Sequence, residues 1–263
     1  MRNTICGLLV LVVILGAVGA TGRASAPRPP HRAALALRVR EEFVHAWKGY
    51  ERYAWGHDEL RPLTQTARDW YGEQSLLMTP VDALDTMLLM GLTAEAEKAK
   101  ALILERLSFD KDISVKNFEI TIRVLGGLLS SYQLTHDRRL LDLAEDLGTR
   151  LLPAFDSPTG MPYMYVNLKT GQTSGAKSNP AEIGTLILEF GTLARLTNKE
   201  VFFDKPKRAL GELTRRRAKT GLVGEEIDVE TGKWTSRTSH IGGGIDSYYE
   251  YLLKCEKLFG DKE

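Results

Sequence analysis

Helix-length segments follow one another along almost the whole chain, and very little of the sequence is typical of strands. Apolar residues recur at helical spacing in these segments, whereas only Met161–Val166 and Glu225–Trp234 are typical of extended structure. We therefore expect an all-α fold built from consecutive helix pairs, with minor β-hairpin segments. The predicted helices cover residues 33–54, 80–91, 94–108, 118–134, 137–151, 181–196, 200–216 and 246–258.

Acidic residues at the helix starts restrict how these pairs can be arranged. Residues 79–82 (TPVD) and 179–182 (NPAE) each place a capping residue, a proline and an acid in the order typical of a helix N-terminus. Asn117 precedes Glu119 in a similar place, and Asp246 follows three glycines. The acids occur on every second helix, which suggests a closed alpha/alpha barrel of helical hairpins whose parallel inner helices share one rim. The acids expected at that rim are Asp82, Glu119, Glu182 and Asp246.

Each of these acids also has a purely structural explanation. An acid in the first turn of a helix interacts favourably with the helix dipole, and an aspartate after glycines is a common N-cap. Glu119 and Arg123 share a helix face one turn apart, where such a pair contributes about 0.2–0.5 kcal/mol. The functional alternative is a pocket, because a ring of acids around a pore suits a neutral polyhydroxylated ligand.

The N-terminus indicates export. Arg2 precedes the apolar run Ile5–Ala20, and small residues follow as far as Ala26, so residues 1–26 are predicted to be a signal peptide. Residues 27–32 are a proline-rich linker, and residues 33–263 form the predicted domain. The expected location is outside the cell or in the periplasm, or the lumen of the secretory pathway in a eukaryote, with no membrane association after cleavage. An uncleaved signal anchor is the alternative, since the apolar run is only slightly shorter than a membrane span.

Charge and cysteine content narrow the function further. The formal net charge is only +1, so the sequence lacks the excess of basic residues that would indicate a nucleic-acid partner. The sequence contains no HExxH motif, paired-cysteine motif or aspartate-rich calcium loop, and the residues alone therefore predict no metal ligands. Cys6 lies in the predicted signal peptide, which leaves Cys255 alone in an apolar helix. We expect Cys255 to be a buried, unreactive thiol.

Five segments in a fixed order carry a family resemblance. They are VDALDTMLLMGL, FEITIRVLGGLLSSY, VNLKTG, AEIGTLILEF and GGGIDSYYEYLLK. Together they resemble the class I alpha-1,2-mannosidases of glycoside hydrolase family 47, and the resemblance extends from about Val39 to Lys254. It implies an alpha/alpha barrel of seven helical hairpins, of which this chain has the length for about the first four. It also implies an exported hydrolase that removes terminal alpha-1,2-linked mannose from an oligosaccharide or N-glycan with inversion.

The resemblance also implies roles for individual residues. Inverting glycosidases use one carboxylic acid to protonate the departing oxygen and one carboxylate to activate water, about 6.5–9.5 Å apart. Glu119 matches the position of the family's general acid, which acts through a water, and Asp246 matches the competing candidate, which contacts the sugar. The residues that match substrate contacts are Arg123, Glu182, Glu250, Asp82 and Asp85.

The chain departs from the family pattern in three respects. The catalytic base and the calcium-holding threonine of the family have no counterpart in this sequence. The resemblance therefore implies calcium as a cofactor, but the residue that holds it in the family is not matched here. Gly244 stands where members that trim one particular mannose carry an arginine. The resemblance therefore does not predict which branch of a glycan this chain would act on. Two further hypotheses therefore stand beside the hydrolase: a mannose-glycan binding module without turnover, and a helical scaffold in which every acid is a cap.

Overall fold

The computed structural model describes residues 32–261, so the predicted signal peptide and the linker as far as His31 lie outside the described residues. The chain divides into two units, residues 1–42 and residues 43–263. The described part of the first unit is the beginning of α1 (Arg32–Tyr53), and the description below is of the second unit. No helix between residues 32 and 261 is both long enough and apolar enough to cross a membrane.

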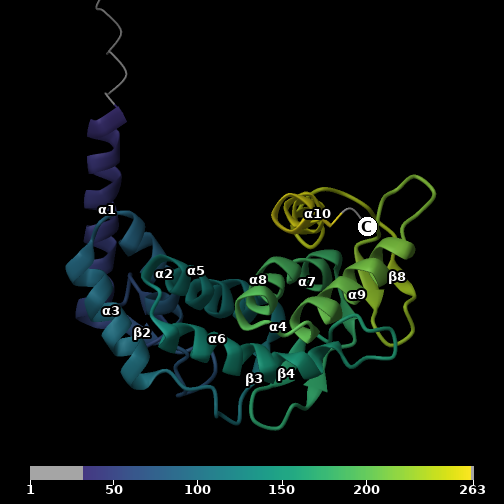
Figure 1. The fold of residues 1–263 in the computed structure, drawn as a ribbon, viewed down its shortest axis with the longest axis horizontal. Coiled ribbons are helices and arrows are strands. Elements are labelled where there is room, and N and C mark those ends of the chain that lie inside the picture. The colour runs from purple at the N-terminus through teal and green to yellow at the C-terminus, as the bar shows by residue number, and fades with distance from the viewer. Residues whose placement is uncertain (1–31, 262–263) are drawn as a thin grey trace, which may run out of the picture. The chain divides into compact units, whose positions relative to one another are not determined.

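The second unit is mostly helical, and its helices form consecutive pairs (Figure 1). In each pair a helix of one row is followed by an antiparallel partner: α2 by α3, α5 by α6, and α8 by α9. Within the first row α2 packs against α5, α5 against α8, and α8 against α10. The bounds of the paired helices are α2 Met78–Leu89, α3 Thr93–Arg106, α5 Gly126–Thr135, α6 Arg138–Leu151, α8 Ile187–Thr197, α9 Val201–Arg215 and α10 Asp246–Phe259.

Short helical segments precede two helices of this row. The α4 segment (Asn117–Ile120) and the π-helical turn η1 (Thr121–Leu125) run directly into α5. The α7 segment (Pro180–Gly184) precedes α8, and the 3-10 helix η2 (Leu152–Phe155) follows α6. Each range predicted from the sequence to be helical contains a helix in the structure. The range predicted as one helix at residues 181–196 is divided into α7 and α8.

Left-handed residues end the helices of the first row. His136 and Asn198, which follow α5 and α8, both have φ of 56°, Gly91 after α2 has φ of 67°, and Gly260 after α10 has φ of 73°. This conformation satisfies the last backbone carbonyl groups of a helix and reverses the chain within a few residues. The short reversals place each partner helix directly against the helix that precedes it.

Three small antiparallel sheets support the helix starts. The strands β3, β4 and β5 form one sheet, β6, β7 and β8 form a second, and β1 and β2 form a third. Strand β3 leads directly into α4, and β6 leads into α7. The strand bounds are β1 Glu59–Arg61, β2 Thr66–Arg68, β3 Ser114–Lys116, β4 Tyr165–Asn167, β5 Thr173–Ser174, β6 Lys177–Ser178, β7 Glu226–Asp228 and β8 Trp234–Ser236.

Several details of the sequence prediction were wrong. Only the last two residues of the extended segment predicted at Met161–Val166 belong to a strand, and strands β1, β2, β3, β5 and β6 were not predicted. The acids do not alternate strictly, because Glu95 and Asp204 lie in the first turns of α3 and α9. Asp82 is not in the first turn of its helix, since α2 already begins at Met78.

Candidate functional site

The start of α2 is positioned by a buried aspartate rather than by its predicted cap. The carboxylate of Asp58 accepts hydrogen bonds from the amides of Trp70 (3.0 Å), Leu76 (2.7 Å) and Met78 (3.2 Å). The Thr79 hydroxyl donates to the Asp58 carbonyl oxygen at 2.7 Å, and the N-cap residue of α2, Leu77, makes no side-chain cap. The prediction that Thr79 caps this helix was therefore wrong, because Asp58, which is distant in sequence, fixes the helix entry instead.

A glycine lets α5 approach this helix start closely. A Cβ atom added to Gly127 would stand 2.7 Å from the carbonyl oxygen of Val81, which is closer than real Cβ contacts. Only glycine allows this backbone approach without a shift. Asp82, the next residue of α2, is thereby brought to the helix segment that carries Glu119 and Arg123.

Arg123 joins the acids of these two helices. Its Nε donates to Glu119 Oε2 at 2.9 Å, one of its terminal nitrogens lies 3.5 Å from Asp82 Oδ2, and its guanidinium stands 5.8 Å from the centre of the Trp70 ring. Partial burial raises the pKa of the Asp82 carboxyl, and the neighbouring Arg123 opposes that shift. Because Arg123 lies in the π-helical turn η1, its backbone departs from α-helical geometry, as often occurs at functional sites.

Asp85 lies one turn beyond Asp82 and is held by a different contact. The Ser130 hydroxyl of α5 donates to Asp85 Oδ2 at 2.7 Å, and the Thr86 hydroxyl donates to Asp85 Oδ1 at 3.3 Å. The two aspartates of α2 thus contact different turns of the neighbouring helix, Asp82 at η1 and Asp85 farther along α5.

Glu182 is linked to the start of α4 by a lysine that the sequence analysis did not identify. Lys116 Nζ lies 2.6 Å from Glu182 Oε1. Burial alone lowers the pKa of Lys116, but the hydrogen bond and charge of Glu182 outweigh it, and the net shift is upward. Asn179 Oδ1 accepts from the Glu182 amide at 3.0 Å, so the predicted cap of this helix is confirmed. Glu182 Oε2 is buried without a hydrogen-bond partner.

The start of α10 lies against α7. The Ala181 amide donates to the Gly244 carbonyl oxygen at 2.9 Å, and the Thr185 hydroxyl donates to Ser247 Oγ at 2.8 Å. The bond from Thr185 coincides with the break between α7 and α8, where Thr185 leaves helical geometry. Asp246 is exposed, and its Oδ1 accepts from the amide of Ser247 at 2.9 Å. It is the first residue of α10, whereas Ile245 occupies the N-cap position.

Two further glutamates, Glu250 of α10 and Glu189 of α8, lie on the same row of helices. Glu250 is exposed on α10 and pairs with Lys254 at 2.5 Å. Glu189 of α8 accepts a hydrogen bond from the Tyr251 hydroxyl at 2.8 Å, while its Oε2 is buried without a partner. Burial raises the pKa of Glu189 to about 7. The sequence analysis missed Glu189, although in the continuous helix predicted at residues 181–196 its place seven residues after Glu182 would put both acids on one helix face.

Each of the four predicted helix starts is in contact with the next one along the chain, but their acids do not form a single hydrogen-bonded cluster. Arg123 joins Asp82 to Glu119, and Lys116 joins the start of α4 to Glu182. One backbone hydrogen bond, from Ala181 to Gly244, and the hydroxyl bond from Thr185 to Ser247 join α7 to the start of α10. Asp246 makes no hydrogen bond or ion pair with the other acids among residues 32–261. The site therefore consists of a bridged acidic group on α2 and α4, with Glu182 and Asp246 on the next two helix starts.

The described part of the chain has no cluster of acidic side chains placed to hold a calcium ion. Between residues 32 and 261 no group of three or more His, Cys, Asp and Glu side chains could hold a metal ion. Asp82, Glu119 and Glu182 each face a cationic side chain instead. No step of the chemistry below is therefore assigned to a metal.

Comparison with known proteins identifies the family. The sequence model of glycosyl hydrolase family 47 matches residues 42–263, so the chain belongs to this family. Human ER degradation-enhancing alpha-mannosidase-like protein 2 is 43% identical over 262 residues, covering 94% of this chain and 44% of the relative. The endoplasmic reticulum mannosyl-oligosaccharide 1,2-alpha-mannosidase of Rattus norvegicus is 42% identical over 247 residues, covering 90% of this chain and 36% of the relative.

A solved structure agrees with this assignment. The alpha-1,2-mannosidase from Trichoderma reesei superposes with a TM-score of 0.79 at 28% sequence identity, covering 85% of this chain and 50% of that one. The chain thus has the mostly helical fold of this mannosidase over the part that aligns. It spans less than half the length of the curated relatives described above.

Proposed function

We propose that the chain carries the acid-bearing part of an alpha-1,2-mannosidase site, in an alpha/alpha barrel of which it forms about four hairpins. The observation that carries this proposal is the bridge made by Arg123, which holds Glu119 and Asp82 from two separate helices at one place. Membership of the family and the names of its relatives supply the substrate class. The proposed substrate is a mannose-containing oligosaccharide or N-glycan with a terminal alpha-1,2 linkage.

Glu119 is the proposed general acid. Its carboxyl group donates a proton to the glycosidic oxygen, through a water, as the bond between that oxygen and the anomeric carbon breaks. Water then adds to the anomeric carbon from the opposite face, which inverts the configuration and requires a second carboxylate as base. We assign no residue of this chain to that second role. Arg123 keeps Glu119 in place through the 2.9 Å bond.

The remaining acids are proposed to hold the sugar. Asp246 is exposed at a helix start and therefore has free acceptor oxygens for sugar hydroxyl groups, and it is also the alternative candidate for the proton donor. Glu182, Glu250, Asp82 and Asp85 lie on the same row of helices and are the proposed further contacts. Because neutral sugars present many hydroxyl groups, carboxylate acceptors suit them without requiring a charged ligand.

Location is part of the proposal. Several relatives carry the endoplasmic reticulum in their names, and the N-terminus has the pattern of a signal peptide. We therefore place the working protein in the lumen of a secretory compartment or outside the cell. Calcium is the cofactor that family membership implies, and we propose that its protein ligand lies in the part of the family domain that this sequence does not match.

Incubation of the purified chain with alpha-1,2-linked mannobiose tests the proposal. Released mannose and binding heat are measured with and without added calcium, for the wild type and for Glu119→Gln. Glu97→Gln is the matched control, because Glu97 is an exposed glutamate paired with Lys100 on α3. Release that is lost only in Glu119→Gln supports the hydrolase. Binding without release in any protein favours the binding module instead, and the absence of both binding and release overturns the proposal.

A further inference from the structure

The loop at residues 237–245 leads directly to Asp246, the proposed sugar contact at the start of α10. It follows β8, and its last part is a run of three glycines at residues 242–244. Gly242 and Gly243 are exposed, and a Cβ atom added to Gly243 would meet no atom of another described residue within 4 Å, its chain neighbours aside. Glycine restricts the backbone less than any other residue. The course of the loop, and with it the direction of Asp246, therefore depends on contacts made to the glycines by other residues.

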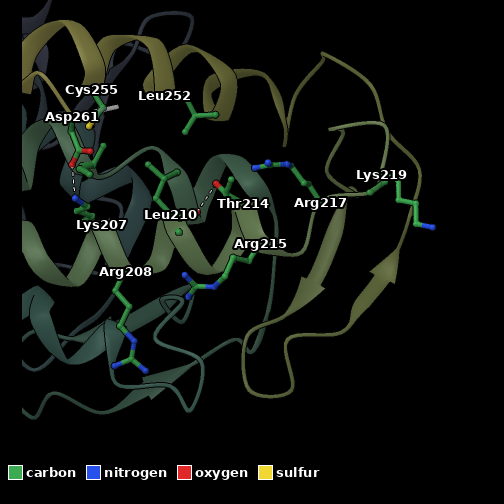
Figure 2. Close-up of a pocket in the computed structure, with 13 residues that line it drawn as sticks. Lys207, Arg208, Leu210, Thr214, Arg215, Arg217, Lys219, Leu252, Cys255 and Asp261 are labelled. Atoms are coloured by element: carbon green, nitrogen blue, oxygen red, sulfur yellow. Dashed lines mark hydrogen bonds and ion pairs between the residues drawn. The ribbon is translucent and has the colours of Figure 1, made fainter. Parts of the chain in front are cut away.

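The body of α10 is held separately from this loop. The helix packs on α7 and α8, and the hydroxyl groups of Tyr248 and Thr214 lie 2.9 Å apart. At its far end Asp261, just beyond α10, forms a 2.8 Å ion pair with Lys207 of α9, which a dashed line marks in Figure 2. These contacts fix the middle and the end of the helix, so its first residue takes its direction from the loop.

His240 contacts the beginning of the glycine run. The Gly242 amide donates to His240 Nδ1 at 3.1 Å. The Gly242 carbonyl oxygen in turn accepts hydrogen bonds from the amides of Ile245 at 3.1 Å and Asp246 at 3.0 Å. A hydrogen-bonded path through one residue, Gly242, thus joins the imidazole to the first amide of α10.

The start of α7 holds the other end of the glycine run. The Ala181 amide donates to the Gly244 carbonyl oxygen at 2.9 Å, and Gly244 has φ of 92°, a conformation that favours glycine. Glu182, another proposed sugar contact, follows Ala181 directly. The loop is therefore held at its end by the helix start that carries Glu182, and at its beginning by the imidazole.

Glu225 orients the ring of His240. Glu225 Oε1 lies 3.6 Å from His240 Nε2, and Glu225 Oε2 accepts from the Ser236 hydroxyl at 3.1 Å. Nδ1 can accept from Gly242 only when it carries no proton, so the proton of the neutral ring is on Nε2 and faces Glu225. A carboxylate on this side therefore favours the tautomer that the Gly242 bond requires. The His240 and Glu225 side chains are 36% and 47% exposed, so this pair contributes little to the stability of the fold.

We propose that His240 is a positioning residue of the sugar site, which orients Asp246 through Gly242 and is itself oriented by Glu225. The inference rests on the proposed function of Asp246 as a sugar contact. His240 touches no sugar and transfers no proton in the reaction. Without its bond to Gly242 the glycines are free to take other conformations, and the Asp246 carboxylate then points in several directions. Sugar binding must order it again, which lowers the affinity.

Two substitutions of His240 separate its contacts. His240→Ala removes both, whereas His240→Asn keeps an acceptor for Gly242, because an asparagine side chain can bond the backbone amide two residues on, but does not reach Glu225. Calorimetric titration with alpha-1,2-linked mannobiose measures the affinity. We expect His240→Ala to weaken binding about threefold to tenfold and His240→Asn to stay within about twofold of the wild type. His45→Ala, at an exposed histidine of α1, is the matched control and is expected to leave the affinity unchanged.

Glu225→Gln tests the orientation of the ring. The amide still accepts from the Ser236 hydroxyl but carries no charge toward His240. We expect it to weaken mannobiose binding about twofold in the wild type and to have no further effect in His240→Asn, since the asparagine does not contact Glu225. Equal effects in both backgrounds would contradict the role of Glu225.

Hydrogen exchange gives a second measurement that needs no sugar. Mass spectrometry of peptides covering residues 242–248 follows the amides that bond the Gly242 carbonyl oxygen. We expect their exchange to be about threefold faster or more in His240→Ala and close to the wild type in His240→Asn, while exchange in α6 and the thermal unfolding midpoint stay unchanged.

The two measurements together decide the proposal. Faster exchange with weaker binding in His240→Ala, both restored in His240→Asn, supports it. Unchanged exchange in His240→Ala, faster exchange without loss of affinity, or no recovery in His240→Asn would overturn it. If the wild type itself does not bind mannobiose, the proposed function is wrong instead, and the exchange rates alone then decide whether His240 holds the start of α10.

Discussion

Gly127 lies against the backbone of Val81, so that a Cβ atom at residue 127 would stand 2.7 Å from the Val81 carbonyl oxygen and 3.1 Å from its carbonyl carbon. This contact sets the separation between α5 and the first turns of α2. The next residue after Val81 is Asp82, whose carboxylate meets Arg123. The separation of two helix backbones thus determines whether the acids of two helices can share one arginine.

Gly127→Ala tests this packing. The obstructing atoms belong to the backbone, so the helices must move apart, and we expect a loss of about 1–3 kcal/mol in the free energy of unfolding. Gly211→Ala in α9 is the matched control, because its nearest neighbour is the end of the Arg215 side chain at 3.7 Å. That change is expected to be neutral or to stabilise by up to about 1 kcal/mol. Urea unfolding measures both, and equal effects of the two changes would contradict the role of the contact.

Asp58→Ala is predicted to destabilise the chain strongly. The carboxylate is fully buried and accepts hydrogen bonds from three amides and from the Ser75 hydroxyl, so its removal leaves buried donors without partners. We expect a loss of about 3 kcal/mol or more in the free energy of unfolding. Asp142→Ala, at an exposed aspartate paired with Arg138, is expected to cost less than about 1 kcal/mol. Similar unfolding midpoints for the two variants would show that Asp58 does not hold the start of α2.

The sequence predicted the helices well because their apolar residues recur over several turns. It did not predict the break at Thr185, because the hydroxyl contact coinciding with that break is to Ser247, 62 residues away. The short strands were missed for a related reason: a segment of two residues such as Lys177–Ser178 shows no alternation and pairs only through the fold. Local pattern is sufficient for a long helix, whereas these features are set by distant partners.

The same distinction applies to the candidate site. The pair Glu119–Arg123 was visible from its helical spacing, and its 2.9 Å bond is present. The bridge from Arg123 to Asp82 and the ion pair of Lys116 with Glu182 join residues of different helices or strands, so no local spacing reveals them. The catalytic and sugar-binding roles remain predictions, since they rest on the resemblance and on these contacts together.

Arg123→Ala is expected to weaken binding of alpha-1,2-linked mannobiose at least tenfold, because Glu119 and Asp82 would lose the cation that holds them and would repel one another. Arg123→Lys is expected to recover only part of the affinity, since a lysine cannot present the two separate donors of a guanidinium. Arg138→Ala on α6 is the control, as it removes an exposed arginine with a similar i, i+4 partner. Calorimetric titration measures the affinities. Unaltered binding in Arg123→Ala would remove Arg123 from the site.

Glu189 is predicted to make the stability of the chain depend on pH. Burial raises its pKa from the ordinary value of 4.5 to about 7 in the folded protein, so the folded state retains a proton that the unfolded chain releases. Between pH 4.5 and about 7 the unfolded state therefore gains from ionisation while the folded state does not, and the free energy of unfolding falls as pH rises. The full decrease from this one group is about 3 kcal/mol, and it levels off above about pH 7.

Glu189→Gln isolates this contribution from the other titrating groups. The amide keeps an oxygen that can accept the 2.8 Å bond from the Tyr251 hydroxyl but does not ionise. We expect the variant and the wild type to have similar stability at pH 4.5, and the variant to be the more stable of the two at pH 8. Urea unfolding at a series of pH values gives the difference between the two proteins. If the stability difference between the two proteins stays constant from pH 4.5 to 8, then folding does not raise the pKa of Glu189, and the prediction is wrong.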